Sequence, residues 1–136
     1  MEEELDGIAC PKRAAGGPCC RRLATGGAGA LVEPAALGAL LAGGGHGYDL
    51  RRVISEKTGG RLDVDPGGLY RVLRRLEADG FVVSRWEESN SGPARREYEL
   101  TAEGRELATS WLTNLRERQQ MTGALADVLE ASLHNA

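Results

Sequence analysis

The sequence predicts a mainly α-helical fold of the α+β class: a winged helix-turn-helix domain with a small β-hairpin wing, followed by a carboxyl-terminal dimerisation helix. Three observations predict it: helical patterns between residues 31 and 80, two β-rich runs around a turn at 88–94, and a long amphipathic stretch over 102–133. Three helices and then a hairpin is the element order of winged helix domains. With 136 residues, the chain is long enough for one such domain with a modest core.

Glycine and proline residues mark the ends of the predicted helices. The first helix ends at glycines 43–45, and the second begins at about Tyr48. The third begins at Asp65-Pro66, an N-cap residue followed by proline at the first helical position, and ends at Gly80. The apolar residues with helical spacing are Leu37, Leu40 and Leu41 in the first helix and Leu69, Val72, Leu73 and Leu76 in the third.

The hairpin is predicted from a β-branched and aromatic run over 81–86 and an alternating run over 95–100. The turn between them is rich in Ser, Gly and Pro. We therefore expect a winged helix domain over residues 31–101. Residues 1–30 are rich in Gly, Ala, Pro and Cys without an amphipathic period, so we expect a flexible cysteine-containing arm there.

Residues 102–136 are expected to form a dimerisation helix that begins near Thr101. Its apolar residues recur at helical spacing and are Leu107, Trp111, Leu115, Leu125, Val128 and Leu129. Such a helix presents an apolar face without an obvious partner in its own chain, and a second copy of the chain is the usual partner. Gly123 is expected to kink or break the helix.

The net charge of −3 conceals an uneven distribution. Residues 30–96 carry ten basic and nine acidic residues, whereas residues 97–136 carry three basic and seven acidic ones, so the acidic excess lies at the carboxyl end. No secretory signal and no apolar run of about 20 residues is present, so we expect a cytoplasmic protein without membrane contact. No phosphate-binding loop and no nucleophile with a plausible base is found, which argues against an enzyme.

The third predicted helix is the candidate recognition helix for double-stranded DNA. Arginines at this spacing reach phosphates and guanine edges in the major groove, and a helix start rich in glycine lets the backbone approach a phosphate. The wing supplies two further basic residues after its turn. The candidate DNA-binding residues are Gly67, Gly68, Tyr70, Arg71, Arg74, Arg75, Arg95 and Arg96. The alternatives are a solvated charged face for the arginines and partial core burial for Tyr70.

Four segments, residues 46–50, 65–70, 76–82 and 95–101, together with Gly104, resemble the PadR family of transcriptional regulators. The resemblance covers roughly residues 31–118. It implies a winged helix domain, a homodimer held by the carboxyl-terminal helix, and repression at an inverted-repeat operator.

Members of the family respond to phenolic acids, drugs or other small effectors. By this resemblance, Trp111 is a candidate for stacking on a flat effector at the dimer interface, with simple packing as the alternative. The chain departs from the family pattern at two positions, with Gly68 where Thr is frequent and Arg71 where Pro is frequent. The departures indicate a base preference different from that of relatives.

The three cysteines, Cys10, Cys19 and Cys20, all lie in the predicted arm, where four basic residues flank them. Such flanking charges favour the reactive thiolate, and a disulfide is disfavoured in a reducing cytoplasm. Three soft donors suit Zn²⁺, Cu⁺, trivalent arsenic or part of an iron–sulfur cluster, with His46 or the partner subunit as a fourth zinc ligand. Because His46 lies in a family-like segment, a bond within the fold is the alternative for that residue.

The sequence thus predicts a DNA-binding regulator that senses a metal, redox state or small effector. Two other functions stay open. In one, the cysteine arm binds metal or acts in redox chemistry and the winged helix docks to a protein partner. In the other, the winged helix serves only in protein interaction, although its exposed arginines argue against this reading.

Overall fold

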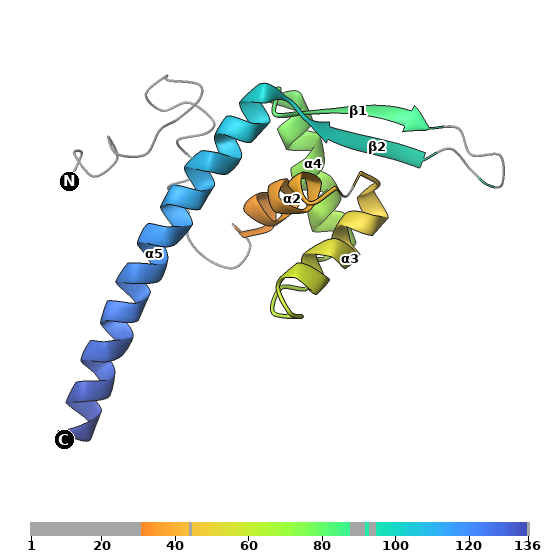
Figure 1. Cartoon of the computed structure of the whole chain (residues 1–136). Coiled ribbons are helices and arrows are strands. Elements are labelled where there is room, and N and C mark those ends of the chain that lie inside the picture. Colours follow the sequence, from red (N-terminus) through yellow and green to blue (C-terminus); the bar gives the residue numbers. More distant parts are fainter. Residues whose placement is uncertain (1–30, 44, 88–91, 93–94, 136) are drawn as a thin grey trace.

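The computed structural model describes residues 31–43, 45–87, 92 and 95–135 (Figure 1). The elements, in chain order, are α2 (Val32–Leu41), α3 (Gly47–Lys57), α4 (Pro66–Ala78), β1 (Val82–Glu87), β2 (Arg95–Leu100) and α5 (Ala102–His134). The three shorter helices gather beside the hairpin, while α5 runs away from them as a long arm (Figure 1). The predicted winged helix layout is confirmed, and the predicted flexible arm at 1–30 lies outside the described residues.

All six described elements contribute to one hydrophobic core. The predicted inward face of α4 is confirmed, because Leu69, Leu73 and Leu76 are almost fully buried. Phe81 and Trp111 are the largest of the fully buried side chains. Of the three leucines with helical spacing in α2, Leu37 is buried, whereas Leu41, the last residue of the helix, is 48% exposed.

The ends of α4 follow the local sequence signals. The Asp65 carboxylate accepts a hydrogen bond from the Gly68 backbone N–H at 3.0 Å, and Pro66 occupies the first helical position. After the helix, Gly80 adopts a φ of +84°, a left-handed conformation that glycine adopts without strain. Helix α4 is therefore bounded by a side-chain cap and a glycine stop, and the hairpin follows directly.

The hairpin pairs β1 with β2 antiparallel, from Val82 opposite Leu100 to Glu87 opposite Arg95. Because side chains alternate across a strand, Val82 and Tyr98 share the face that is buried against the helices. The opposite face carries Arg85, Glu87 and Glu97, which are exposed or half-buried.

Helix α5 begins at Thr101, whose hydroxyl oxygen accepts a hydrogen bond from the Gly104 N–H at 3.0 Å. The predicted kink or break at Gly123 is wrong, since the helix continues to His134. A single glycine inside a helix costs only about 1 kcal/mol relative to alanine, which the neighbouring turns offset. Within the described residues, no helix is both long and apolar enough to span a bilayer.

The prediction that the apolar face of α5 lacks a partner in its own chain is correct for only half of the helix. Leu107 and Trp111 are buried in the core, and Leu115 packs against it. Further along, the large apolar side chains are 57–75% exposed; these are Met121, Leu125, Val128, Leu129 and Leu133.

The two halves of α5 present one continuous face. Leu125, Leu129 and Leu133 each follow a core-facing residue, Leu107, Trp111 or Leu115, by 18 positions. At about 3.6 residues per turn, 18 positions are five full turns, so the paired residues point in the same direction. The face that packs on the domain in the first half therefore lies bare in the second.

Gly104→Ala is expected to lower the free energy of unfolding by roughly 1–3 kcal/mol or more. A Cβ at this position would lie 2.1 Å from the Phe81 carbonyl oxygen, a backbone atom that no rotamer change can move away. Denaturant unfolding measures the effect. The matched control is Gly38→Ala in α2, where a Cβ meets nothing within 4 Å and helix propensity predicts unchanged or higher stability. Equal stability of the two variants would contradict this packing.

Candidate nucleic-acid interface

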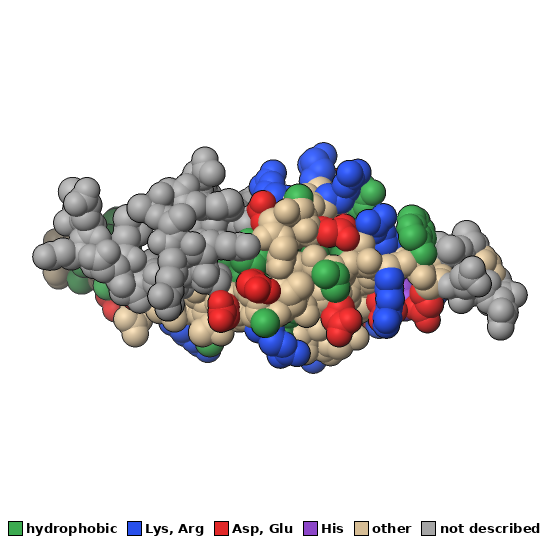
Figure 2. Space-filling view, turned by 90° about the horizontal axis from the view of Figure 1, so that it is seen from above, with side chains coloured by type: hydrophobic (Ala, Val, Ile, Leu, Met, Phe, Trp, Pro, Cys, Tyr) green, Lys and Arg blue, Asp and Glu red, His purple; other side chains and the backbone are tan. Residues whose placement is uncertain are grey.

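The solvent-facing side of α4 carries a row of basic side chains. Arg71, Arg74 and Arg75 are exposed and lie opposite the buried leucines of the same helix. In Figure 2, several Lys and Arg side chains gather along the upper edge of the described surface, and others lie at its lower edge. Arg74 and Arg75 follow Arg71 by three and four residues, so the three side chains lie on one helix face within just over one turn.

Tyr70 belongs to this same face. Tyr70 is 49% exposed, so the residue is only partly buried and about half of it remains accessible. The Arg74 guanidinium carbon lies 5.7 Å from the centre of the Tyr70 ring, within the range of a cation–π contact. The exposed Tyr70 ring is thus available for stacking, and the Arg74 guanidinium beside it is available for a phosphate contact.

Gly67 and Gly68 contribute no side chains to the first turn of α4. A Cβ at Gly68 would make only ordinary contacts, about 3.8 Å from an Arg71 guanidinium nitrogen and from the Asp65 carboxylate. The departure from threonine at this position therefore has no steric cause in the fold. Arg71, the other departure, extends its guanidinium back toward this turn and adds positive charge where a helix start already attracts anions.

Arg96, predicted as a wing contact to DNA, also takes part in a hydrogen-bond network within the fold. Its Nε donates to the Ser84 hydroxyl oxygen at 2.9 Å, and its Nη2 donates to a Glu77 carboxylate oxygen at 3.2 Å. The Ser84 hydroxyl donates a short hydrogen bond to Glu77, and the Arg96 guanidinium carbon lies 5.4 Å from the centre of the Trp86 ring. Arg96 thus ties the wing to α4, and Arg95 is exposed at the start of β2.

Sequence reasoning missed Glu77 and Ser84. The strand alternation places Ser84 and Arg96 on the same face of the hairpin, a signal available once the register is known. Hydrogen bonding from Ser84, together with the charge and hydrogen bond of Arg96, holds the pKa of the Glu77 carboxyl below its ordinary value, although partial burial opposes the shift. The network therefore depends on an ionised Glu77.

The opposite face of the hairpin meets the start of α3. His46 Nε2 lies 2.7 Å from a Glu87 carboxylate oxygen, and the His46 backbone forms a bridge with Glu97. The hydrogen bond with His46 is the largest influence that lowers the pKa of Glu87. The alternative that His46 bonds within the fold is confirmed.

Trp111, the candidate for effector stacking, lies inside the protomer. Its indole is 2% exposed, and Nε1 donates a hydrogen bond to the buried Glu33 carboxylate at 2.8 Å, which joins α5 to α2. The Arg118 guanidinium carbon lies 5.7 Å from the ring centre. This is the arrangement of a packing residue, and effector stacking by Trp111 stays a prediction that requires the ring to become accessible.

The cysteine prediction falls on Cys10, Cys19 and Cys20, which lie outside the described residues. A thiolate-bound metal, an iron–sulfur cluster and a redox role for these residues all stay predictions.

Comparison with known proteins agrees with this geometry. A family model described as the transcriptional regulator PadR-like family matches residues 37–110, which are 74 of the 136 residues. Transcriptional regulator Rv3488 of Mycobacterium tuberculosis (strain ATCC 25618 / H37Rv) is 38% identical over 73 residues. The alignment covers 54% of this chain and 62% of Rv3488, so the chain spans less than two thirds of that relative's length.

Solved structures with the same fold include two PadR proteins. A PadR-like transcription factor from Bacteroides fragilis is 26% identical with a TM-score of 0.59, over 71% of this chain and 91% of that one. Bacillus subtilis PadR in complex with operator DNA is 27% identical with a TM-score of 0.55, over 60% of this chain and 46% of that one.

The helical group, the hairpin wing and the exposed arginines of α4 define a winged helix-turn-helix protein. Within that class, the match over more than half of its length shows that the chain belongs to the PadR-like family of transcriptional regulators. The resemblance inferred from the sequence motifs is confirmed, and a family of regulators agrees with the prediction that the chain is not an enzyme.

Glu77→Gln is expected to lower stability at neutral pH, because the neutral amide cannot replace the ionised acceptor of Arg96 and Ser84. A carboxyl whose pKa is lower in the folded state stabilises the fold above its unfolded pKa of about 4.3 and loses that contribution as the pH falls through the folded-state value. The stability difference between wild type and variant should therefore be constant at neutral pH and shrink below about pH 4.3.

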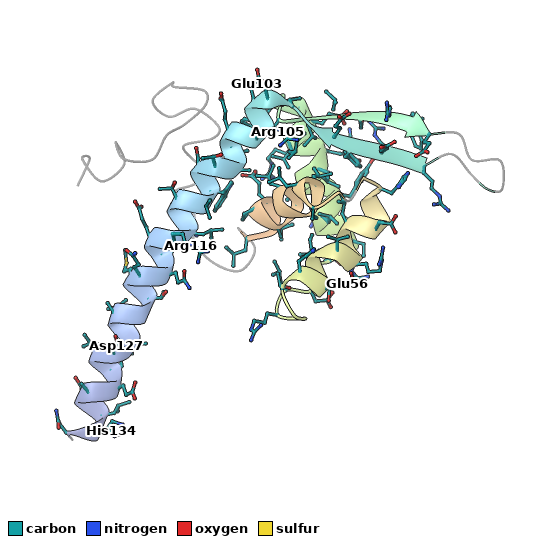
Figure 3. All side chains as sticks on the ribbon, in the orientation of Figure 1. Glu56, Glu103, Arg105, Arg116, Asp127 and His134 are labelled. Carbon is teal, nitrogen blue, oxygen red and sulfur yellow. The ribbon has the colours of Figure 1, made fainter. Side chains whose placement is uncertain are left out.

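Denaturant unfolding across a pH series measures this difference. The control is Glu56→Gln, which removes an exposed ion pair with Arg52 on α3 (Figure 3 labels Glu56) and should change stability little at any pH. A difference for Glu77→Gln that stays the same down to pH 3 would contradict the assigned role of the carboxylate.

Proposed function

We propose that this protein is a DNA-binding transcriptional repressor that acts as a homodimer on an inverted-repeat operator. The observation that carries the proposal is the exposed arginine row on α4, the helix that the winged helix layout presents as the recognition helix. It is supported by the similarity to Bacillus subtilis PadR, which was solved in complex with operator DNA.

The contacts divide by chemistry. Arg71, Arg74 and Arg75 supply bidentate donors for guanine edges and for phosphates. Arg95 places a positive charge at the start of the second wing strand, beside the turn of the hairpin. The Glu77–Ser84–Arg96 network sets the angle of that wing relative to the recognition helix, so that both elements reach the duplex together.

The homodimer is supported by the bare half of α5. Five large apolar side chains lie exposed along one face of this helix, and exposed apolar patches of this kind mark interaction sites. In a twofold dimer, the same face of each copy covers that of the other. A twofold dimer presents two recognition helices in inverted orientation, which matches an inverted repeat. Sensing of a metal, redox state or small effector stays a prediction.

Arg74→Ala/Arg75→Ala is expected to weaken binding to DNA from upstream of the protein's own gene by at least about 30-fold, because two base-contacting arginines at roughly 1–3 kcal/mol each together contribute at least about 2 kcal/mol. Fluorescence anisotropy at several salt concentrations measures the affinity, and each lost phosphate contact lowers the salt slope by about 1.

The control removes the same charge elsewhere. Arg105 and Arg116 are exposed on α5, as labelled in Figure 3, so Arg105→Ala/Arg116→Ala should leave specific affinity close to that of wild type. Equal loss in the two double variants would mean that only overall charge matters and would contradict α4 as the recognition helix.

Leu125→Glu is expected to convert the dimer to a folded monomer and to weaken operator binding. Leu125 is 57% exposed in the protomer, so the charge is tolerated there, whereas a dimer interface would bury it on both copies. Sedimentation velocity and circular dichroism report the oligomeric state and the fold. Gln120→Glu, an exposed position on the other side of α5, is the control and should stay dimeric. A dimeric Leu125→Glu variant would rule out this face as the interface.

A further inference from the structure

Three elements bring an imidazole and two carboxylates together beside the wing. His46 precedes α3, Glu87 ends β1, and Glu97 lies within β2. One ligand atom from each residue lies within 4.8 Å of the other two. His46 Nε2 and a Glu87 carboxylate oxygen are 2.7 Å apart, so the ring nitrogen already faces the carboxylates.

The backbone holds these groups in place independently of the side-chain contacts. His46 bridges Glu97, and the Tyr98 N–H donates to the Gly45 carbonyl at 2.6 Å, which fixes the start of α3 against β2. The strand register puts Glu87 and Glu97 on the same face of the hairpin. The cluster is therefore set by the fold and is not a chance meeting of long side chains.

The distances and ligand types suit a transition-metal ion. Zinc binds histidine nitrogen and carboxylate oxygen at about 2.0–2.2 Å, so the ligand atoms of a tetrahedral site are about 3.3 Å apart. The ligand atoms of His46 and Glu87 are 2.7 Å apart, and no two ligand atoms of the cluster are more than 4.8 Å apart. These separations bracket about 3.3 Å, so small rotations of the side chains would bring the three ligand atoms to tetrahedral spacing. The metal would replace the hydrogen of the His46–Glu87 bond, and that proton would leave to solvent.

The residues around the three groups are also compatible with a bound metal ion. Asp49 Oδ2 lies 3.7 Å from His46 Nδ1, on the side of the ring that a metal-bound histidine turns toward a carboxylate. Arg85 is the competing cation, with its Nε 3.5 Å from a Glu97 carboxylate oxygen. Its side chain is 72% exposed, and such surface pairs are weak, so a divalent ion displaces it at little cost.

We propose that His46, Glu87 and Glu97 form a binding site for a divalent transition-metal ion of the zinc type, with solvent as the fourth ligand. The ion would join the start of α3 to both strands of the wing. The proposed ligand set contains none of the three cysteines. The effect of the ion on DNA affinity, through a stiffer wing, rests on the proposed function, whereas metal binding itself does not.

Zn²⁺ titration by calorimetry tests the site on the full chain, with Cys10, Cys19 and Cys20 replaced by Ser to remove thiol ligands. One Zn²⁺ per chain is expected. Glu87→Gln and Glu97→Gln, introduced separately, should each weaken binding by at least about 10-fold, the lower range for losses even of outer-shell partners.

The matched control is Glu99→Gln, an exposed position on the same face of β2 that lies outside the cluster, which should bind Zn²⁺ like the parent. Absence of Zn²⁺ binding in the cysteine-free chain, or equal affinity of the Glu97→Gln and Glu99→Gln chains, would overturn the proposal.

Hydrogen exchange gives a second readout that needs no DNA. Saturating Zn²⁺ should slow exchange of the β1 and β2 amides in the cysteine-free chain and leave the Glu97→Gln chain unchanged, because a ligand that binds only the folded hairpin opposes its opening. Unchanged exchange in both chains would overturn the proposed link between α3 and the wing. Failure of DNA binding in the anisotropy experiment would leave either result intact.

Discussion

The close approach of the first turn of α5 to the corner at Gly80 and Phe81 is the constraint on which the arrangement of the molecule depends. The Thr101 N–H donates to the Phe81 carbonyl at 3.1 Å, and the Thr101 hydroxyl donates to the Gly80 carbonyl at 2.8 Å. Gly104 has no side chain because the Phe81 carbonyl oxygen occupies that space. The end of α4, the start of β1 and the start of α5 therefore meet at one point, which sets the directions of recognition helix, wing and long helix together.

From this corner, the hairpin extends away from the core, and side-chain bonds attach each of its two faces to a helix. On one face, Arg96 and Ser84 bond to Glu77 of α4, and on the other, Glu87 bonds to His46 at the start of α3. Both attachments are ionic or strongly polar, so they hold the wing by specific geometry where the hairpin has moved beyond the hydrophobic core. Because the Arg96 guanidinium bonds to Ser84 and Glu77, the exposed arginines of α4 form the main basic surface.

The parts of the fold that sequence predicted are those with local causes. Asp65-Pro66 and Gly80 bound α4 because a cap, a ring-fixed φ and a positive φ act within a few residues. The arginine face of α4 followed from helical spacing for the same reason.

What escaped prediction depends on residues distant in the chain. Trp111 and Glu33 are 78 residues apart, and His46 and Glu87 are 41 apart, so neither pair exists until the helices and the hairpin are assembled. The bond between Arg96 and Glu77 escaped prediction because the two residues face each other only in the folded register. The break expected at Gly123 failed because helix propensity is a weak local term that neighbouring turns override.

The second half of α5 links the fold to its mode of action. An isolated helical extension is marginal in water, so tertiary packing is what normally stabilises one of this length. Here the packed face of the first half continues in register as an uncovered face in the second, which makes a second chain the natural source of that packing. Charge separates along the same direction: α4 carries three arginines and one acidic residue, whereas α5 carries five acidic and three basic residues. Phosphates therefore attract the α4 end of the molecule and repel the α5 end, a charge pattern that supports the proposal that α4 faces DNA while the apolar face of α5 meets a second copy.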